Sequence, residues 1–240
     1  MTIGMFDDPV GDTRLPHQSL PLGFHLIIET AICAAWKLML YQGRPGFDLQ
    51  TADEDTVTHE LYERLYDEIF DKGIVDGFDH EVFAAVRREP KIRNFSGSNP
   101  DKMPDLLVEF IDRPAGVMNS QYGLFIECKP VDQKHPVGSA YCDKGLIRFI
   151  RGDYAWAMRS AMMVGYARDG YFLISKLSTA LASKRKEPIP TCLELESCPH
   201  TQAMVFAEQV VISRHKRTFQ YIDNHTPAGI IVIRHLWLRR

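Results

Sequence analysis

The chain has 240 residues, of which 45% are hydrophobic and 25% are charged, and its formal net charge is −3. These proportions are typical of a globular domain and exclude the highly charged, apolar-poor composition of disordered chains. We expect no apolar stretch to reach the length of a membrane span. The first 21 residues contain Asp7, Asp8 and Asp12 and lack the basic-then-apolar order of a signal peptide. We therefore expect no membrane partner and a cytoplasmic location.

The cysteine content and the charge distribution say less about cofactors and partners. The five cysteines are odd in number and unevenly spaced, which does not favour a disulfide framework. Cys192, Cys198 and His200 are zinc-binding residue types, but their spacing fits no common structural zinc site. Residues 1–120 contain 11 basic and 21 acidic residues, whereas residues 121–240 contain 17 and 10. The basic half could follow a phosphate backbone, or the charge could simply vary along one mixed surface.

The first half of the chain predicts two helices after an irregular arm. Residues 1–22 are rich in Pro, Gly and Asp, and residues 24–41 have the length and the Ala and Leu content of a largely buried helix. Residues 51–70 predict a second helix, because apolar residues recur every four positions and three acidic residues precede them. Residues 81–94 then predict a strand, and residues 95–102 a loop.

The second half predicts strands that alternate with two more helices. Strands are expected at 104–111 and 122–129, and a helix is expected from about residue 140 to residue 155, where Gly152 could interrupt it. The remaining predicted elements are a strand at 160–167, a helix at 171–184, a loop at 187–199, and strands at 203–213, 218–222 and 229–238. We divide the chain into an N-terminal arm and helix (1–50), an α/β core (51–186) and a C-terminal β element packed on the core (187–240).

Two short runs of residues in neighbouring predicted strands contain the strongest candidates for a catalytic site. Met103-Pro104-Asp105 opens one strand, and Ile126-Glu127-Cys128-Lys129 lies in the next. Side chains alternate between the faces of a strand, so Glu127 and Lys129 share a face, and strand pairing could bring Asp105 beside them. Carboxylate oxygens hold divalent cations, and a lysine can orient or deprotonate water. The alternative is an ordinary hairpin with solvated Asp, Glu and Lys.

This pattern resembles the PD-(D/E)xK nuclease superfamily, which has the restriction-endonuclease-like fold. The resemblance covers residues 56–166 and implies an α/β protein with a mixed central sheet flanked by helices. It implies that Asp105 and Glu127 bind Mg²⁺ or Mn²⁺, that the carbonyl of Cys128 adds a ligand, and that Lys129 is the catalytic lysine. The motif is short and degenerate, and the resemblance is strengthened by the position of its two halves on consecutive predicted strands.

Several further residues are candidates around this site. An acidic residue on the first core helix or first strand could complete the metal shell, and we rank Glu60 ahead of Glu81 and Glu89; each is otherwise a solvated acid. Glu29 lies in an apolar helix, where a charge must be paired or functional. The expected nucleic-acid-binding residues are Arg148, Arg151, Lys184 and Arg185. The basic run at 214–217 could also contact phosphates, whereas we do not expect His215 or His235 to bind a metal.

The sequence therefore predicts a metal-dependent DNA endonuclease, with RNA not excluded as substrate. Restriction, antiphage defence or a mobile element would be its setting, with a homodimer or larger oligomer and a regulatory protein as expected partners. One alternative is a catalytically silent nuclease-like module that binds nucleic acid or protein. A second is an interaction protein that assembles through its acidic and basic halves.

Overall fold

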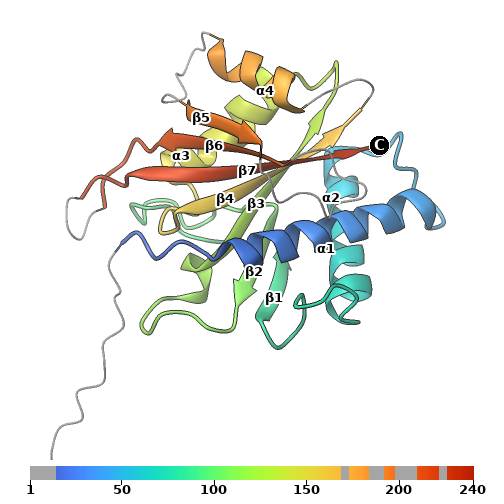
Figure 1. Cartoon of the computed structure of the whole chain (residues 1–240), viewed down its shortest axis with the longest axis horizontal. Helices are drawn as coiled ribbons and strands as arrows, with labels where there is room; N and C mark the ends of the chain where they lie inside the picture. The colour runs from blue at the N-terminus through green and yellow to red at the C-terminus, as the bar shows by residue number, and fades with distance from the viewer. Residues whose placement is uncertain (1–14, 169–172, 184–191, 198–209, 222–225) are drawn as a thin grey trace, which may run out of the picture.

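The computed structural model describes residues 15–168, 173–183, 192–197, 210–221 and 226–240. Within these residues, seven strands form one mixed sheet that is flanked by helices (Figure 1), so the expected fold class is confirmed. The strands are β1 (Phe83–Arg88), β2 (Leu106–Phe110), β3 (Gly123–Val131), β4 (Ser160–Ala167), β5 (Cys192–Ser197), β6 (Val211–Lys216) and β7 (Ile230–Arg239). The helical elements are α1 (Leu22–Tyr41), α2 (Glu54–Glu63), η1 (Arg64–Phe70), η2 (Asn119–Gln121), η3 (Val137–Leu146), α3 (Ile147–Arg151) and α4 (Leu173–Ala182).

The strand order in the sheet is β1-β2-β3-β4-β7-β6-β5. The strands β1, β2 and β3 pair antiparallel, β3, β4 and β7 pair parallel, and β7, β6 and β5 pair antiparallel. The last strand of the chain therefore lies inside the sheet, between β4 and β6. The C-terminal strands extend the same sheet that carries the Asp105 and Glu127 segments.

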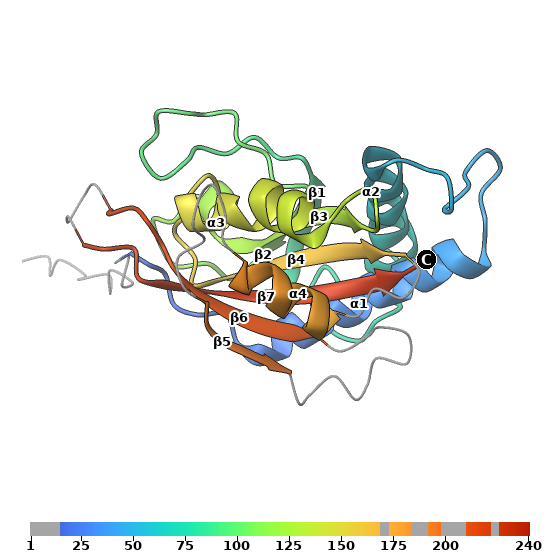
Figure 2. The same cartoon turned by 90° about the horizontal axis from the view of Figure 1, so that it is seen from above.

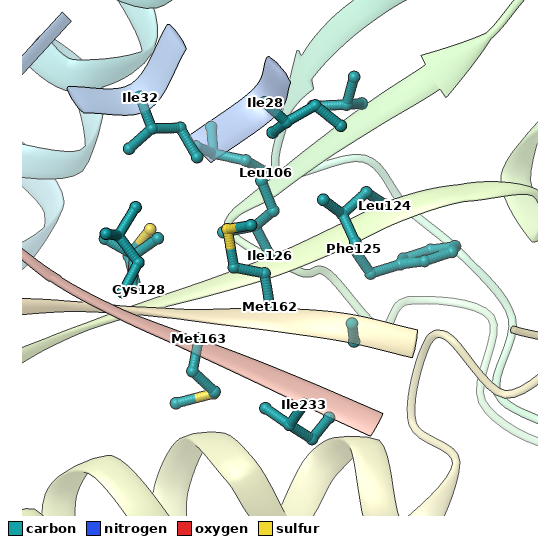
Figure 3. Close-up of a cluster of buried hydrophobic side chains, with 14 of the residues drawn as sticks. Ile28, Ile32, Leu106, Leu124, Phe125, Ile126, Cys128, Met162, Met163 and Ile233 are labelled. Atoms are coloured by element: carbon teal, nitrogen blue, oxygen red, sulfur yellow. The ribbon is translucent and has the colours of Figure 1, made fainter. Parts of the chain in front are cut away.

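Helices cover the two faces of this sheet. The helix α1 lies across one face, and η3 with α3 lies on the other (Figure 2). Figure 3 shows Ile28 and Ile32 of α1 on the same side as Leu106, whereas Met163 and Ile233 point towards the opposite helix. All five side chains are fully buried, so the sheet is apolar on both faces, as expected for parallel strands between two helical layers.

The apolar helix α1 is part of the core. By length and composition alone, its 20 residues could cross a membrane, so the expectation that no segment reaches that length is wrong. It buries one side against the sheet, and its Glu29 forms an ion pair with Arg234 of β7 through two hydrogen bonds. A charged, paired residue at the centre of the helix fits a core helix that packs on a polar partner.

Two predicted elements differ from the structure, and a third lies mostly outside the described residues. The strand β5 lies in the segment expected to be a loop, and its pairing with β6 is a tertiary effect that local composition does not show. Residues 218–222 were expected to form a strand, but an isolated bridge pairs Gln220 with Pro227. The alternating Phe219 and Tyr221 are instead buried in a small cluster with Ala228. Most of the expected strand at 203–213 lies outside the described residues.

Candidate active site

The start of β2 and the middle of β3 bring Asp105, Glu127 and Lys129 together. These strands pair antiparallel, with Leu106 opposite Ile126. Because side chains alternate along a strand, the three polar residues project from the face opposite α1. The ammonium of Lys129 lies 2.9 Å from Glu127 Oε1 and 3.6 Å from Asp105 Oδ2. The Asp, Glu and Lys residues that the sequence pattern singled out therefore lie next to one another in the folded protein.

The backbone of Cys128 completes this arrangement. Its N–H donates to Asp105 Oδ2 at 2.5 Å, and its carbonyl oxygen accepts from Lys129 Nζ at 2.9 Å. The Cys128 side chain is fully buried on the α1 side of the sheet, and burial raises the pKa of its thiol well above the ordinary value. The carbonyl of Cys128, and not its sulfur, therefore faces the site.

A third carboxylate comes from Glu54, the first residue of α2. Asp53 caps this helix, since its side chain accepts from the Thr56 N–H at 2.8 Å. The cap begins the helix directly before Glu54, whose Oε1 lies 2.5 Å from Lys129 Nζ. The acidic run at 53–55 predicted only a helix start, so the contact of Glu54 with Lys129 was not expected from the sequence.

Glu60, ranked first from the sequence, makes other contacts. Its Oε1 lies 2.8 Å from Arg64 Nε and 3.3 Å from Arg44 Nε. Glu54, six residues earlier on the same helix, contacts Lys129 instead. Glu54 precedes the buried Thr58 and Leu61 by four and seven residues, so it lies on the buried face of the helix.

Arg148 and Tyr154 bind the carboxylate of Glu127. Arg148 of α3 donates from Nη1 to Glu127 Oε1 at 2.9 Å, and the Tyr154 hydroxyl donates to Glu127 Oε2. The helix α3 ends at Gly152, which has a left-handed φ of 76°, and this turn carries the chain back to Tyr154. Arg148 was expected near the active site, whereas nothing in the local pattern pointed to Tyr154.

Burial controls the charge of the cluster. Burial, and then Asp105, raise the pKa of Glu127 to about 7, although Lys129, Arg148 and Tyr154 oppose this increase. Burial lowers the pKa of Lys129, but the neighbouring Glu127, Asp105 and Glu54 raise it by more, so its net shift is upward. Lys129 is therefore a cation at neutral pH, and the pKa of Glu127 is raised towards neutral pH.

The helical segment η3 packs tightly over these side chains. A Cβ atom added at Gly145 would lie 2.7 Å from Met163 Cε, 3.3 Å from Lys129 Cγ and 3.4 Å from Glu127 Cγ. Glycine therefore lets the helix approach the sheet closely at the site. This contact covers the aliphatic parts of Lys129 and Glu127 and leaves them little freedom to move.

The comparisons with known proteins do not identify the chain. No protein-family model, no curated protein and no solved structure matches it. The interpretation of the site therefore rests on its own geometry.

In that geometry, four oxygen-bearing groups surround the ammonium of Lys129. The carboxylates of Glu54, Asp105 and Glu127 and the carbonyl of Cys128 all surround the ammonium of Lys129. Among the described residues, no group of three or more His, Cys, Asp or Glu side chains is arranged to hold a metal ion. The ammonium itself lies between the carboxylates. The donor types are hard oxygens, which suit Mg²⁺ and Mn²⁺ better than zinc.

The other expected nucleic-acid contacts have different surroundings. Arg151 is exposed on α3, one turn after Arg148. Lys184 and Arg185 lie outside the described residues. Within the run at 214–217, Arg217 is buried and donates to the backbone carbonyls of Trp156, Met158 and Ala228, so it holds loops together. It is not available to bind phosphate.

The two tail histidines belong to a buried hydrogen-bonded chain. Ser213 Oγ lies 2.6 Å from His215 Nε2 and 2.7 Å from His235 Nε2, and Tyr141 Oη lies 2.9 Å from His235 Nδ1. Both histidines are fully buried. Burial lowers the pKa of His235 well below its ordinary value, so its ring is neutral. Of the zinc candidates, Cys198 and His200 lie outside the described residues, as does the side chain of Cys192.

Proposed function

We propose that this chain is a metal-dependent nuclease that hydrolyses phosphodiester bonds in DNA. One observation carries the proposal: carboxylates from Glu54, Asp105 and Glu127 converge with the Cys128 carbonyl around Lys129, and Arg148 adjoins them. Structural ion pairs rarely need three buried or half-buried carboxylates around one ammonium, because each buried charge costs free energy. A cluster of this composition is better explained by a ligand that it binds.

The donor set fits a divalent cation. Asp105, Glu127 and the Cys128 carbonyl would hold Mg²⁺ or Mn²⁺, with Glu54 as the further acidic residue of the site. A bound cation would polarise the phosphate and lower the pKa of a bound water, which makes that water a better nucleophile at neutral pH. Deprotonation of Glu127, whose pKa is about 7 in the protein alone, would accompany cation binding.

The cationic side chains have separate roles towards the substrate. Lys129 is charged at neutral pH, so it orients a water or a phosphate oxygen as a hydrogen-bond donor. Arg148 is partly exposed at the same site and offers further donors to a phosphate, while its bond to Glu127 fixes its position. Tyr154 holds the second oxygen of Glu127 and thereby its orientation.

The biological setting is proposed from the activity, because a nuclease that cleaves DNA has to be restrained in the cell. A cytoplasmic enzyme in restriction, antiphage defence or a mobile element would need a partner protein or self-assembly to restrain it. A homodimer would supply two sites for the two strands of a duplex.

The test is cleavage of supercoiled and linear DNA by the purified chain with Mg²⁺, Mn²⁺ or EDTA. We expect metal-dependent cleavage that Lys129→Ala abolishes, since the ammonium then no longer orients the attacking group. The control is Lys72→Ala, which removes a surface lysine paired with Glu68. Cleavage by Lys129→Ala at the wild-type rate would refute the mechanism.

The principal alternative is a catalytically silent binding module, and the closed position of Lys129 among the carboxylates is the observation that favours it. Calorimetry with Mg²⁺ separates the two functions when no cleavage is seen. A nuclease that awaits its partner binds Mg²⁺ and loses this binding in Asp105→Ala, whereas a silent module does not bind the cation.

A further inference from the structure

A second polar site lies on the outer part of the same sheet. A groove of about 720 Å³ is bounded by η1 and the end of α2 on one side and by β1 and the segment after it on the other. Its lining includes Tyr62, Tyr66, Arg87, Arg88 and Glu109. The volume is that of a pocket for a small organic ligand.

The groove is lined in part by β2, the strand that directly follows Asp105. Glu109 lies on β2, four residues after Asp105, and the alternation of side chains places both on the same face of the sheet. At the other side, Arg88 of β1 pairs with Leu106, and the Glu89 N–H donates to the Asp105 carbonyl at 3.0 Å. A chain bound across Asp105 that also follows β2 would therefore reach the groove.

Glu109 forms a polar floor with an unused acceptor. The residue is 4% exposed, and its Oε1 accepts from Arg87 Nε at 2.8 Å. Its Oε2 is buried and has no hydrogen-bond partner among the described residues. An unpaired buried carboxylate oxygen costs free energy, so this atom fits a site in which a ligand supplies an N–H donor.

Aromatic and basic side chains form the walls. Tyr62 and Tyr66 are half-buried, and their ring centroids are 6.0 Å apart. Arg87 and Arg88 line the groove together with Tyr62, and burial raises the pKa of Tyr62 while the two arginines oppose this increase. The neighbouring Lys91 is 71% exposed and lines the same groove. Aromatic rings that stack on bases and cationic side chains that bind phosphates are the two components of a single-strand binding surface.

We propose that this groove binds a nucleotide of a single-stranded segment next to the bond that the active site cleaves. The base stacks on Tyr62 or Tyr66 and donates its amino group to Glu109 Oε2, while Arg88 and Lys91 contact phosphates. Adenine, cytosine and guanine carry such an amino group. Thymine does not, and its N3–H is flanked by two carbonyl oxygens that repel a carboxylate. This inference rests on the proposed nuclease for its biological meaning, but its binding test does not require cleavage.

The test is fluorescence anisotropy with labelled ten-nucleotide strands of dA, dC and dT, in EDTA and in the Lys129→Ala background. We expect tighter binding of the dA and dC strands than of the dT strand. Tyr62→Ala should weaken binding of all three by about 10-fold, because base stacking is lost. Glu109→Gln should remove the preference against dT and leave dT binding within about 2-fold of the wild type.

Matched variants keep the test independent of folding. Tyr41→Ala removes an exposed tyrosine of α1 that does not line the groove, and it should bind all strands like the wild type. Arg88→Ala should weaken binding of the three strands equally, which supports the groove even where Glu109→Gln is unstable. Thermal melting of each variant identifies those that are folded.

The outcomes separate the groove from the nuclease. Strand binding with the expected dependence on Tyr62 and Glu109, but no cleavage, would support the groove and count against the nuclease. Cleavage with strand binding that is unchanged in Tyr62→Ala and Arg88→Ala would refute the groove and leave the nuclease intact. Absence of single-strand binding would also refute it. If dAMP binds as tightly as the dA strand, the groove is a mononucleotide site, and the proposed contact with the cleaved strand is wrong.

Discussion

At the scale of single residues, the site depends on how a few side chains share their partners. Lys129 contacts three carboxylates and a carbonyl oxygen, and Glu127 is held by Lys129, Arg148 and Tyr154. Removing one member therefore changes the charge of several others, and the effects of separate substitutions will not be additive.

Glu54 and Glu60 provide a matched pair of acidic residues on one helix. Glu54→Gln should lower cleavage by about 10- to 100-fold, because the Lys129 ammonium and a bound cation lose a charged oxygen. Glu60→Gln should leave the cleavage rate of the folded protein unchanged and lower only its stability, since Arg64 loses its ion pair. Plasmid cleavage rates and urea denaturation of both variants test this. A larger loss of cleavage in Glu60→Gln would restore the original assignment of Glu60.

The raised pKa of Glu127 makes stability depend on pH. Its pKa is about 7 in the folded protein and about 4.5 when exposed, so the folded state binds this proton more tightly than the unfolded state. The resulting stabilisation is present below about pH 4.5 and is lost as the pH rises through about 7. Relative to Glu127→Gln, which does not titrate, the wild type should lose about 3 kcal/mol between about pH 4 and pH 8.

Urea denaturation in EDTA at several pH values measures this difference directly. EDTA is needed because a bound cation would favour the ionised carboxylate and reverse the trend. A stability difference between the wild type and Glu127→Gln that is constant with pH would show that Glu127 is not buried as described.

At the scale of secondary-structure elements, the candidate site lies where two strands and two helices meet. The strands β2 and β3 supply the central residues, the first turn of α2 supplies Glu54, and α3 supplies Arg148. The closest contact is that of η3, whose Gly145 lies directly over the side chains of Glu127 and Lys129. The spacing between this helix and the sheet therefore restricts the positions of these two side chains.

Gly145→Val tests that spacing. The added side chain would collide with Met163, Lys129 and Glu127, so we expect a loss of about 1–3 kcal/mol in the free energy of unfolding and a further loss of cleavage in the folded fraction. Gly43→Val is the control, since nothing lies within 4 Å of the position that its Cβ would take. Equal stability and activity of the two variants would show that η3 does not restrain the site.

At the scale of the whole molecule, contacts between distant parts of the chain hold the two layers together. The pair of Glu29 in α1 and Arg234 in β7 joins residues 205 positions apart and is almost fully buried. Trp36 of α1 also donates to the Arg239 carbonyl at 2.7 Å. The N-terminal helix and the C-terminal strand are thus parts of one cooperative core.

Breaking the buried pair should destabilise the whole fold. Arg234→Met leaves Glu29 buried without its partner, which should cost about 3–5 kcal/mol, and the double variant with Glu29→Leu should recover most of this loss. Lys72→Met, which breaks the exposed pair with Glu68, should cost less than about 1 kcal/mol. Urea denaturation of the four proteins gives these values. A double variant as unstable as Arg234→Met would show that packing, and not the unpaired charge, causes the loss.

The amino-acid sequence was enough to predict the α/β class, the positions of most helices and strands, and the strand pair at which Asp105, Glu127 and Lys129 meet. It could do so because hydrophobic periodicity and side-chain alternation are local properties. The strand at 160–167 was predictable for the same reason, whereas the helix expected to reach residue 155 ends at Arg151, directly before Gly152.

Three features could be seen only in the folded structure. Glu54 and not Glu60 contacts Lys129, and Tyr154 donates to Glu127. The strand β7 lies inside the sheet. Each of these depends on how elements far apart in the chain pack, and the helix cap at Asp53 fixes Glu54 through a geometry that composition does not contain. The partner of Glu29 was equally hidden, since 205 residues separate it from Arg234. Local physics specifies which segments form, whereas long-range packing specifies which of their side chains meet.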